Sequence, residues 1–129
     1  MFTIEQIKAA HAKVHSGADF PDYVQDLIQL GVIFYETYVK DGHTEYYGEA
    51  NYQITSGPVY EPLIIATKTD RIAFLDDLKA HQRGLTNYMA FCNDCARSGI
   101  AKWAMDMQKR TCTYYDWAGN EILVENIPN

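Results

Sequence analysis

The sequence predicts an α+β fold built from two similar halves, with four helices packed on one face of a mainly antiparallel or mixed sheet. In each half, apolar residues first recur with the 3.6-residue period of a helix and then with the two-residue period of a strand. The order helix, helix, strand, strand, strand therefore occurs twice. We expect one domain over residues 1–129, with halves at 3–57 and 69–126 and a connection at 58–68.

Short segments in the two halves match at a constant offset of 68 in residue number. Tyr46-Tyr47 aligns with Tyr114-Tyr115, and the helix-ending Gly31 aligns with Gly99. The alternation of side chains along the strands supports the same offset. Alternate residues from 33 to 39, and the residues 68 positions later (101 to 107, here called their mates), place apolar side chains on the same face. Tyr23 and Tyr88 are related by a smaller offset of 65, which predicts that the fourth helix is one turn longer than the second.

Two helices open the first half. The first is predicted to start after Thr3, a favourable N-cap in a capping-box pattern, and to end at Gly17. The second is predicted to start at Asp19, with Pro21 in its first turn, and to end at Gly31.

A hairpin and a short third strand follow. Asp41-Gly42 is the pair favoured in a two-residue type I′ turn, and such a turn would pair Lys40 with His43 and Glu36 with Tyr47. The third strand is expected within residues 52–55.

The predicted register assigns the hairpin side chains to two faces. Tyr46 would point toward the helices, with Ile33, Tyr35 and Val39. The opposite, outer face would carry a mixed aromatic and acidic set, namely Phe34, Glu36, Tyr38, His43, Glu45 and Tyr47.

The second half repeats this pattern after a connection with two prolines and no clean period, which has at most an edge strand. Thr69 and Thr86 are predicted to cap two helices that end at Gly84 and Gly99. The helix residues expected to be apolar and buried include Ile72. Three strands are expected at 101–108, 111–116 and 121–126. Their outer face would carry mostly small and charged groups, with Ile100 outward and Tyr115 apart from other aromatic rings.

Composition limits the partners. The chain of 129 residues has 11 Lys plus Arg against 17 Asp plus Glu, a formal charge of -6, and no basic cluster beyond Lys109-Arg110, so no nucleic-acid partner is expected. No apolar run approaches the roughly 20 residues that span a bilayer, so no membrane partner is expected. Three cysteines, an odd number, fit a reducing compartment. The prediction is a soluble, acidic, cytoplasmic protein without a cofactor.

The cysteines support one alternative, a zinc or thiol-dependent enzyme. Cys92 and Cys95 form a Cys-x-x-Cys motif, and Cys112 and His81 are the further ligands that a zinc site would need. A redox pair places its first thiol at a helix N-terminus, whereas Cys92 lies inside a predicted helix. Because Cys92 and Cys95 are the mates of Val24 and Leu27 in the first half, the favoured interpretation is buried structural cysteine.

Other chemical motifs gain little support. His11 and His15 have the i, i+4 spacing that can bind a metal from one helix face, although a hydrogen-bonded histidine is commoner there. His43 beside Glu45 is expected to be solvated at the hairpin tip. The sequence has no Gly-rich phosphate loop, no nucleophile elbow and no paired-carboxylate motif. No catalytic residue, cofactor ligand or metal ligand is assigned.

The outer aromatic residues Phe34, Tyr38 and Tyr47 are the predicted interaction surface, in a non-enzymatic binding protein that associates with itself or with a partner protein. One alternative is that residues 58–66 of the same chain cover this face. Another is a small-ligand pocket between the halves, where Tyr46 and Tyr114 approach the pseudo-axis from opposite sides.

Several segments also carry a family resemblance: "FTIEQIKAAHAKVHSGADFPDYVQDLIQLGV", "YETYVKDGHTEYYG", "TCTYYD" and "GNEILVE". Over essentially the whole chain, the sequence resembles the YbcV-like family of small bacterial and prophage-associated proteins, a domain of unknown function sometimes labelled phage envelope protein. The resemblance implies an α+β fold and no catalytic residue, cofactor or ligand. The envelope label finds no support in the residues, which show no signal peptide, membrane span or fibrous repeat.

Overall fold

The computed structural model describes residues 1–15 and 17–128, and it confirms the α+β class. Six strands form one sheet in the order β3-β2-β1-β4-β5-β6. All five strand pairings in the described part are antiparallel, so the sheet is antiparallel rather than mixed. The strands are β1 (Val32–Tyr38), β2 (Thr44–Gly48), β3 (Gln53–Thr55), β4 (Ile100–Asp106), β5 (Thr111–Asp116) and β6 (Glu121–Asn126).

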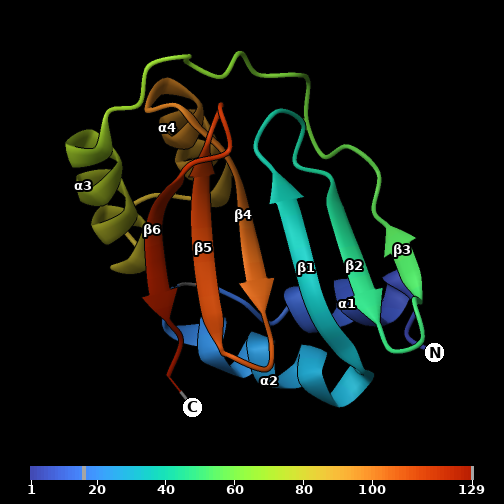
Figure 1. The fold of residues 1–129 in the computed structure, drawn as a ribbon. Coiled ribbons are helices and arrows are strands. Elements are labelled where there is room, and N and C mark those ends of the chain that lie inside the picture. Colours follow the sequence, from blue (N-terminus) through green and yellow to red (C-terminus); the bar gives the residue numbers. More distant parts are fainter. Residues whose placement is uncertain (16, 129) are drawn as a thin grey trace.

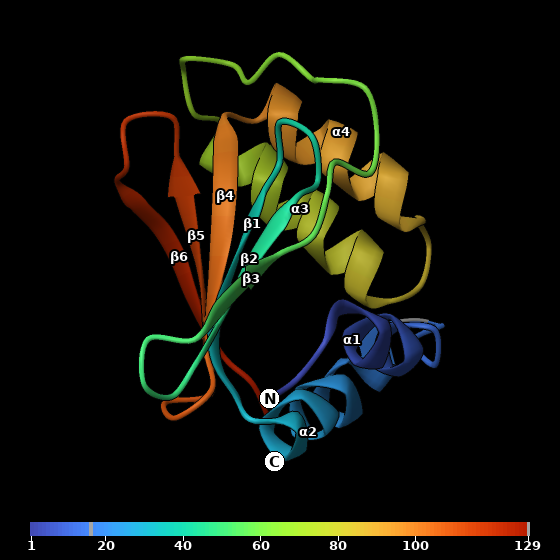
Figure 2. The same cartoon turned by 90° about the vertical axis from the view of Figure 1, so that its right-hand side faces the viewer.

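Four α-helices cover one face of this sheet (Figure 1). They are α1 (Ile4–His11), α2 (Phe20–Leu30), α3 (Arg71–Gln82) and α4 (Tyr88–Arg97), and the short 3₁₀ helix η1 (Gly17–Asp19) precedes α2. Figure 2 shows the sheet edge-on, with all four α-helices on one side of it and none of the described helices on the other. The longest helix in the described ranges, α3, has 12 residues, and none of these helices has the length and apolar character needed to cross a membrane.

The two halves meet through their first strands, β1 and β4. Glu36 lies opposite Ala104, and these residues are each other's mates at the offset of 68. The same offset converts the pair Tyr35–Met105 into the pair Thr37–Trp103, which is also observed. A pseudo-two-fold axis therefore passes between Glu36 and Ala104.

The offset of 68 holds for α2 and α4, which start at Phe20 and Tyr88. The expected extra length of the fourth helix is wrong, because α4 has 10 residues and α2 has 11. The true mate of Tyr23 is Phe91, and both rings are buried. The longer helix is α3, with 12 residues against 8 in α1.

Helix ends show why some expected boundaries differ. The capping box at Thr3 is confirmed, but α1 ends at His11 rather than at Gly17. Four residues after this end, the backbone N–H of His15 donates to the Asp19 carboxylate at 2.8 Å, so it does not continue the hydrogen-bond pattern of α1.

The helices of the second half start slightly later than expected. Their N-caps are Asp70 and Asn87, each one residue after the predicted threonine, and each side chain accepts a backbone N–H inside its helix. Ile72, predicted to be buried, is 76% exposed at the start of α3.

The hairpin register differs from the prediction by two residues. Tyr38, rather than Lys40, pairs with His43, Glu36 lies opposite Glu45, and a four-residue loop replaces the two-residue turn. A type I′ turn needs positive φ at both central residues, whereas in this loop only Gly42 has it, at +76°. The Val39 N–H bonds to the Ala101 carbonyl, so the end of β1 stays attached to β4.

A register shift of two residues leaves every side chain of the hairpin on its predicted face. Two other predicted face assignments, those of Ile33 and Ile100, are wrong because of β-bulges. β1 bulges between Val32 and Phe34, and β4 bulges at the equivalent place between Ile100 and Lys102. A bulge sets two residues opposite one and interrupts the alternation. Ile33 is therefore 39% exposed instead of facing the helices, and Ile100 is fully buried instead of facing outward.

Candidate functional site

The candidate site is the outer face of the sheet, opposite the helices. Strand alternation places the predicted Phe34, Tyr38 and Tyr47 there, and all three are half-buried. The observed register sets Phe34 directly opposite Tyr47, with ring centroids 5.7 Å apart. Charged and aromatic neighbours join them, and we call this set the outer-face cluster: Phe34, Glu36, Tyr38, His43, Glu45, Tyr47, Lys102 and Tyr115.

One row of the cluster crosses four neighbouring segments of the sheet. The ring of His43 stacks on Tyr38, with centroids 4.5 Å apart and planes 4° apart. The next residue in the row is Lys102 on β4, followed by Tyr115 on β5. The Lys102 ammonium lies 5.7 Å from the Tyr38 ring centroid and 5.1 Å from that of Tyr115. A cation is thus held between two tyrosine rings that come from different halves.

A carboxylate completes the surroundings of this cation. Lys102 Nζ donates to Glu36 Oε2 at 2.7 Å, and the two side chains are 30% and 17% exposed. This hydrogen bond is the main reason that the pKa of Lys102 is raised. At partly exposed positions such an ion pair contributes about 0–1 kcal/mol, and each cation–π contact about 0.5–1 kcal/mol.

A second set of contacts surrounds His43. Its Nδ1 lies 2.5 Å from Asp41 Oδ1 and its Nε2 lies 3.5 Å from Glu45 Oε2. Burial alone would raise the pKa of Asp41, but hydrogen bonds from the ring and backbone of His43 outweigh it and lower that pKa. Tyr47 donates to Glu45 Oε1 at 2.9 Å. His43, expected to be solvated, is therefore engaged on both ring nitrogens.

Two tyrosines of the cluster, Tyr38 and Tyr47, are held in their neutral form. The hydrogen bond to Glu45, together with burial, raises the pKa of Tyr47 to about 12. Burial and the charges of Glu36 and Glu45 raise the pKa of Tyr38. Both rings stay uncharged near neutral pH and present apolar faces with polar edges, which is the character of interface tyrosine.

Within the described residues the chain does not fold back over this surface, so the alternative that residues 58–66 cover it is wrong. The connection instead crosses the hairpin tip, where the N–H groups of Val59 and Leu63 donate to the Asp41 and Lys40 carbonyls at 2.8 and 2.7 Å. The Tyr60 hydroxyl bonds to the carbonyl of Val39, a residue that is fully buried. Figures 1 and 2 show the connection (green) passing over the upper end and the helix side.

Sequence reasoning placed Tyr115 apart from other aromatic rings and did not select Lys102. Both belong to the cluster because β1 pairs with β4, which sets Tyr38 opposite Lys102, and β4 pairs with β5, which sets Lys102 opposite Tyr115. The constant offset of 68 was the sequence signal from which the pairing of β1 with β4 could have been inferred. Two repeats related by a two-fold axis must meet through equivalent strands, and β1 and β4 are such a pair.

The cysteines behave as core residues. Cys92 and Cys95 are fully buried like their mates Val24 and Leu27, and Cys112 is 2% exposed. Burial raises the pKa of all three thiols, which is the reverse of what a nucleophilic thiolate needs.

The predicted zinc ligands do not assemble into a ligand set. His81 stacks on Phe91 at 4.4 Å, and its Nδ1 lies 3.2 Å from the Thr86 carbonyl oxygen. Within residues 1–15 and 17–128, no group of three or more His, Cys, Asp or Glu side chains is arranged to hold a metal ion. His11 and His15 do not share a helix, since α1 ends at His11.

Tyr46 and Tyr114, proposed to border a pocket between the halves, are packed into the core. They are 8% and 7% exposed, and their rings lie 5.7 Å from Tyr35 and 5.0 Å from Phe74. The two tyrosines are therefore packed among other core side chains. They give no support to a small-ligand pocket between the halves.

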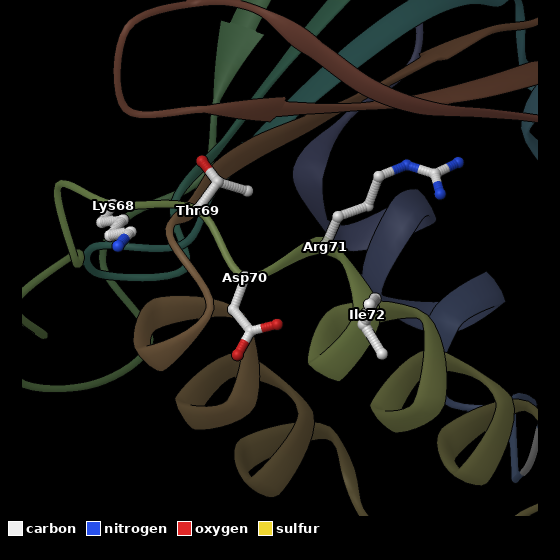
Figure 3. Close-up of a pocket in the computed structure, with 5 residues that line it drawn as sticks. All are labelled: Lys68, Thr69, Asp70, Arg71 and Ile72. Carbon is white, nitrogen blue, oxygen red and sulfur yellow. The ribbon is translucent and has the colours of Figure 1, made fainter.

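A shallow hollow lies at the start of α3 and is lined by residues 68–72 (Figure 3). Three of its polar side chains have structural partners: Asp70 caps the helix, Thr69 donates to Asp116 at 3.4 Å, and Arg71 donates to the Ile122 carbonyl at 3.1 Å. The side chains of Lys68 and Arg71 point away from each other in Figure 3. These hydrogen bonds therefore attach the start of α3 to β5 and β6. They do not direct polar side chains toward a ligand in the hollow.

Comparison with known proteins decides the family. The family model described as "Protein of unknown function (DUF1398)" matches residues 8–126, which covers all the elements of both halves except the start of α1. The chain belongs to the DUF1398 family. The match includes every residue of the outer-face cluster, so the cluster lies within the DUF1398 region.

Similar proteins occur in mycobacteria. "Uncharacterized protein Mb2035" of Mycobacterium bovis and "Uncharacterized protein Rv2012" of Mycobacterium tuberculosis strain H37Rv are each 34% identical to this DUF1398 chain over 71 residues. Each match covers 50% of this chain and 43% of the relative. The match thus spans less than half the length of these relatives, and their names assign no activity.

Proposed function

We propose that the protein is a non-enzymatic interaction module and that a partner protein docks on the outer-face cluster. The observation that carries this proposal is that the sheet face is left open by the described chain although it bears aromatic rings from both halves. Tyr and Phe are enriched at protein interfaces, where a ring buries a large area at low entropic cost. The cluster contributes four such rings, those of Phe34, Tyr38, Tyr47 and Tyr115.

Charge favours a different protein over a second copy of this chain. The outer face of the four central strands carries three carboxylates, those of Glu36, Glu45 and Asp106, against the single ammonium of Lys102. Two copies packed face to face would oppose like charges, which is unfavourable in a desolvated interface. Self-association becomes the competing outcome of the test.

The DUF1398 family has no assigned function, so the match does not specify a cellular role or location for this chain. The resemblance to YbcV-like prophage-associated proteins stays a prediction based on the segments quoted above. Cytoplasmic location stays a prediction from the odd cysteine count and the absence of an apolar run in the sequence.

Site-specific photocrosslinking, carried out in the cells that natively contain the protein, tests the proposal. A photoreactive phenylalanine analogue is placed at Tyr47 in the cluster and, as a matched control, at the exposed Ile72 on the helix side. We expect a discrete adduct from position 47 that is lost when Tyr38→Glu is added, and none from position 72. Equal adducts from both positions, or an adduct from position 72 alone, would refute docking on the outer face.

The oligomeric state separates a partner protein from a second copy. The chain has a mass of 14.7 kDa, so light scattering coupled to size-exclusion chromatography distinguishes a monomer from a dimer directly. We expect a monomer for the wild type and for the Tyr38→Glu, Tyr47→Glu double variant. A wild-type dimer that the double variant dissociates would assign the face to self-association instead.

A further inference from the structure

We infer that the partner presents a lysine- or arginine-rich segment, and that one of its cationic side chains displaces Lys102 from between Tyr38 and Tyr115. The inference rests on the proposed docking face and names the chemistry that this face selects. Its starting point is that the face already binds a cation, the ammonium of its own chain.

The surroundings of Lys102 are those of a cation site. Two ring centroids lie 5.7 and 5.1 Å from Nζ, within the range of a cation–π contact, and a carboxylate oxygen accepts from it at 2.7 Å. None of these three contacts depends on Lys102 being part of the same chain. An ammonium or guanidinium group from a partner would find the same rings and the same oxygen of Glu36.

Lys102 is placed so that it can leave. Its side chain is 30% exposed, and the bonds that hold it lie at the surface of the sheet rather than in the core. A lysine side chain has four flexible carbons and regains rotational freedom when it swings into solvent. Its departure would leave Glu36, only 17% exposed, without its cation, so the vacated position favours an incoming positive charge.

The wider charge pattern selects the same class of partner. The formal charge of -6 on the chain attracts basic segments over a distance of about a Debye length. The same sign repels nucleic acid and anionic lipid, which removes the two commonest polyanionic surfaces from consideration. Tyr47 and Phe34, which pair on the same face beyond Glu36 and Glu45, would pack against the aliphatic part of a further basic side chain.

The test is a titration of the full ¹⁵N-labelled chain with a synthetic peptide of alternating lysine and glycine, and with a control peptide in which glutamate replaces lysine. We expect amide shift changes confined to the outer-face cluster and its strands, with affinity that falls when salt is raised from about 50 to about 300 mM. The control peptide should produce no shift changes on that face.

Three charge variants make the test specific. Lys102→Met removes the resident cation and should strengthen lysine-peptide binding about fivefold, whereas Glu36→Gln should weaken it about fivefold. Asp76→Asn removes the same charge as Glu36→Gln from an exposed position on α3, and its affinity should stay within about twofold of the wild type. Circular dichroism and urea unfolding check that each variant folds.

The outcomes separate this inference from the proposed function. Unchanged or weaker binding by folded Lys102→Met, or an equal effect of Asp76→Asn and Glu36→Gln, would overturn cation exchange at Lys102. If photocrosslinking at position 47 succeeds while the lysine peptide does not bind, the docking face stands and the cationic partner is wrong. If both fail, the proposed function fails as well.

Discussion

The two glycines that end α2 and α4 should respond very differently to the same substitution. Gly31 and Gly99 are mates in the repeat and have φ of +101° and +81°, so alanine at either one adopts a strained left-handed backbone that costs about 1–2 kcal/mol. A methyl group at Gly31 meets only Phe2 Cδ2, at 3.9 Å. At Gly99 it would lie 2.9 Å from the Lys68 carbonyl oxygen and 3.0 Å from Thr69 Cα.

The clash at Gly99 involves backbone atoms of the connection, which cannot rotate away as a side chain can. Overpacking of this kind costs a further ~1–3 kcal/mol. We therefore expect Gly31→Ala to lower the free energy of unfolding by about 1–2 kcal/mol and Gly99→Ala by about 2–5 kcal/mol.

Urea unfolding followed by circular dichroism measures both changes, with Gly57→Ala as the control. Gly57 has no atom within 4 Å of an added methyl group and no positive φ, so its substitution should be close to neutral. Equal losses for Gly31→Ala and Gly99→Ala, within about 0.5 kcal/mol, would show that the connection does not press on the α4–β4 turn as described.

Two further predictions concern titratable groups. The folded-state pKa of Asp41 lies below its ordinary value of 3.8, so its ionised form stabilises the fold above that value and this stabilisation is lost as the pH falls through the lowered pKa. The difference in free energy of unfolding between the wild type and Asp41→Asn should thus be largest near neutral pH and decrease as the pH falls through the lowered pKa of Asp41. A difference that increases over that pH range would contradict the hydrogen bonds from His43. For the thiols, burial raises the pKa of Cys112 to about 12 and also raises those of Cys92 and Cys95. A thiol reagent at mildly alkaline pH should therefore modify the three cysteines only after denaturation, and one rapidly modified thiol in the native protein would revive the thiol-enzyme alternative.

Local signals in the sequence were sufficient for the elements and for most face assignments. β5 and β6 have the predicted bounds, and Gly31 and Gly99 end helices because glycine adopts positive φ without strain. The predicted aromatic residues Phe34, Tyr38 and Tyr47 reach the outer face even though the predicted turn was wrong. They do so because a two-residue error in register keeps the parity of each strand.

Contacts between distant segments account for the errors. The loop at Asp41-Gly42 is longer than its composition suggests because Val39 is bonded to Ala101, which belongs to the other half of the chain. The bulges that turn Ile33 outward and Ile100 inward are set by the partner strands and leave no local signal. The place of Lys102 in the candidate site required the β1–β4 pairing, which local periodicity does not specify.

The pseudo-two-fold axis between Glu36 and Ala104 has a consequence for how such a surface can arise. In a symmetric dimer of one half, the residue on the axis would have to face its own copy, and a glutamate there would meet a second glutamate. In a single chain the two positions are different residues, so that constraint is absent. Glutamate in one copy and alanine in the other place a single carboxylate at the centre of the sheet, directed at Lys102. The pseudo-symmetric backbone of the two halves thus carries an asymmetric pattern of charge on its outer face.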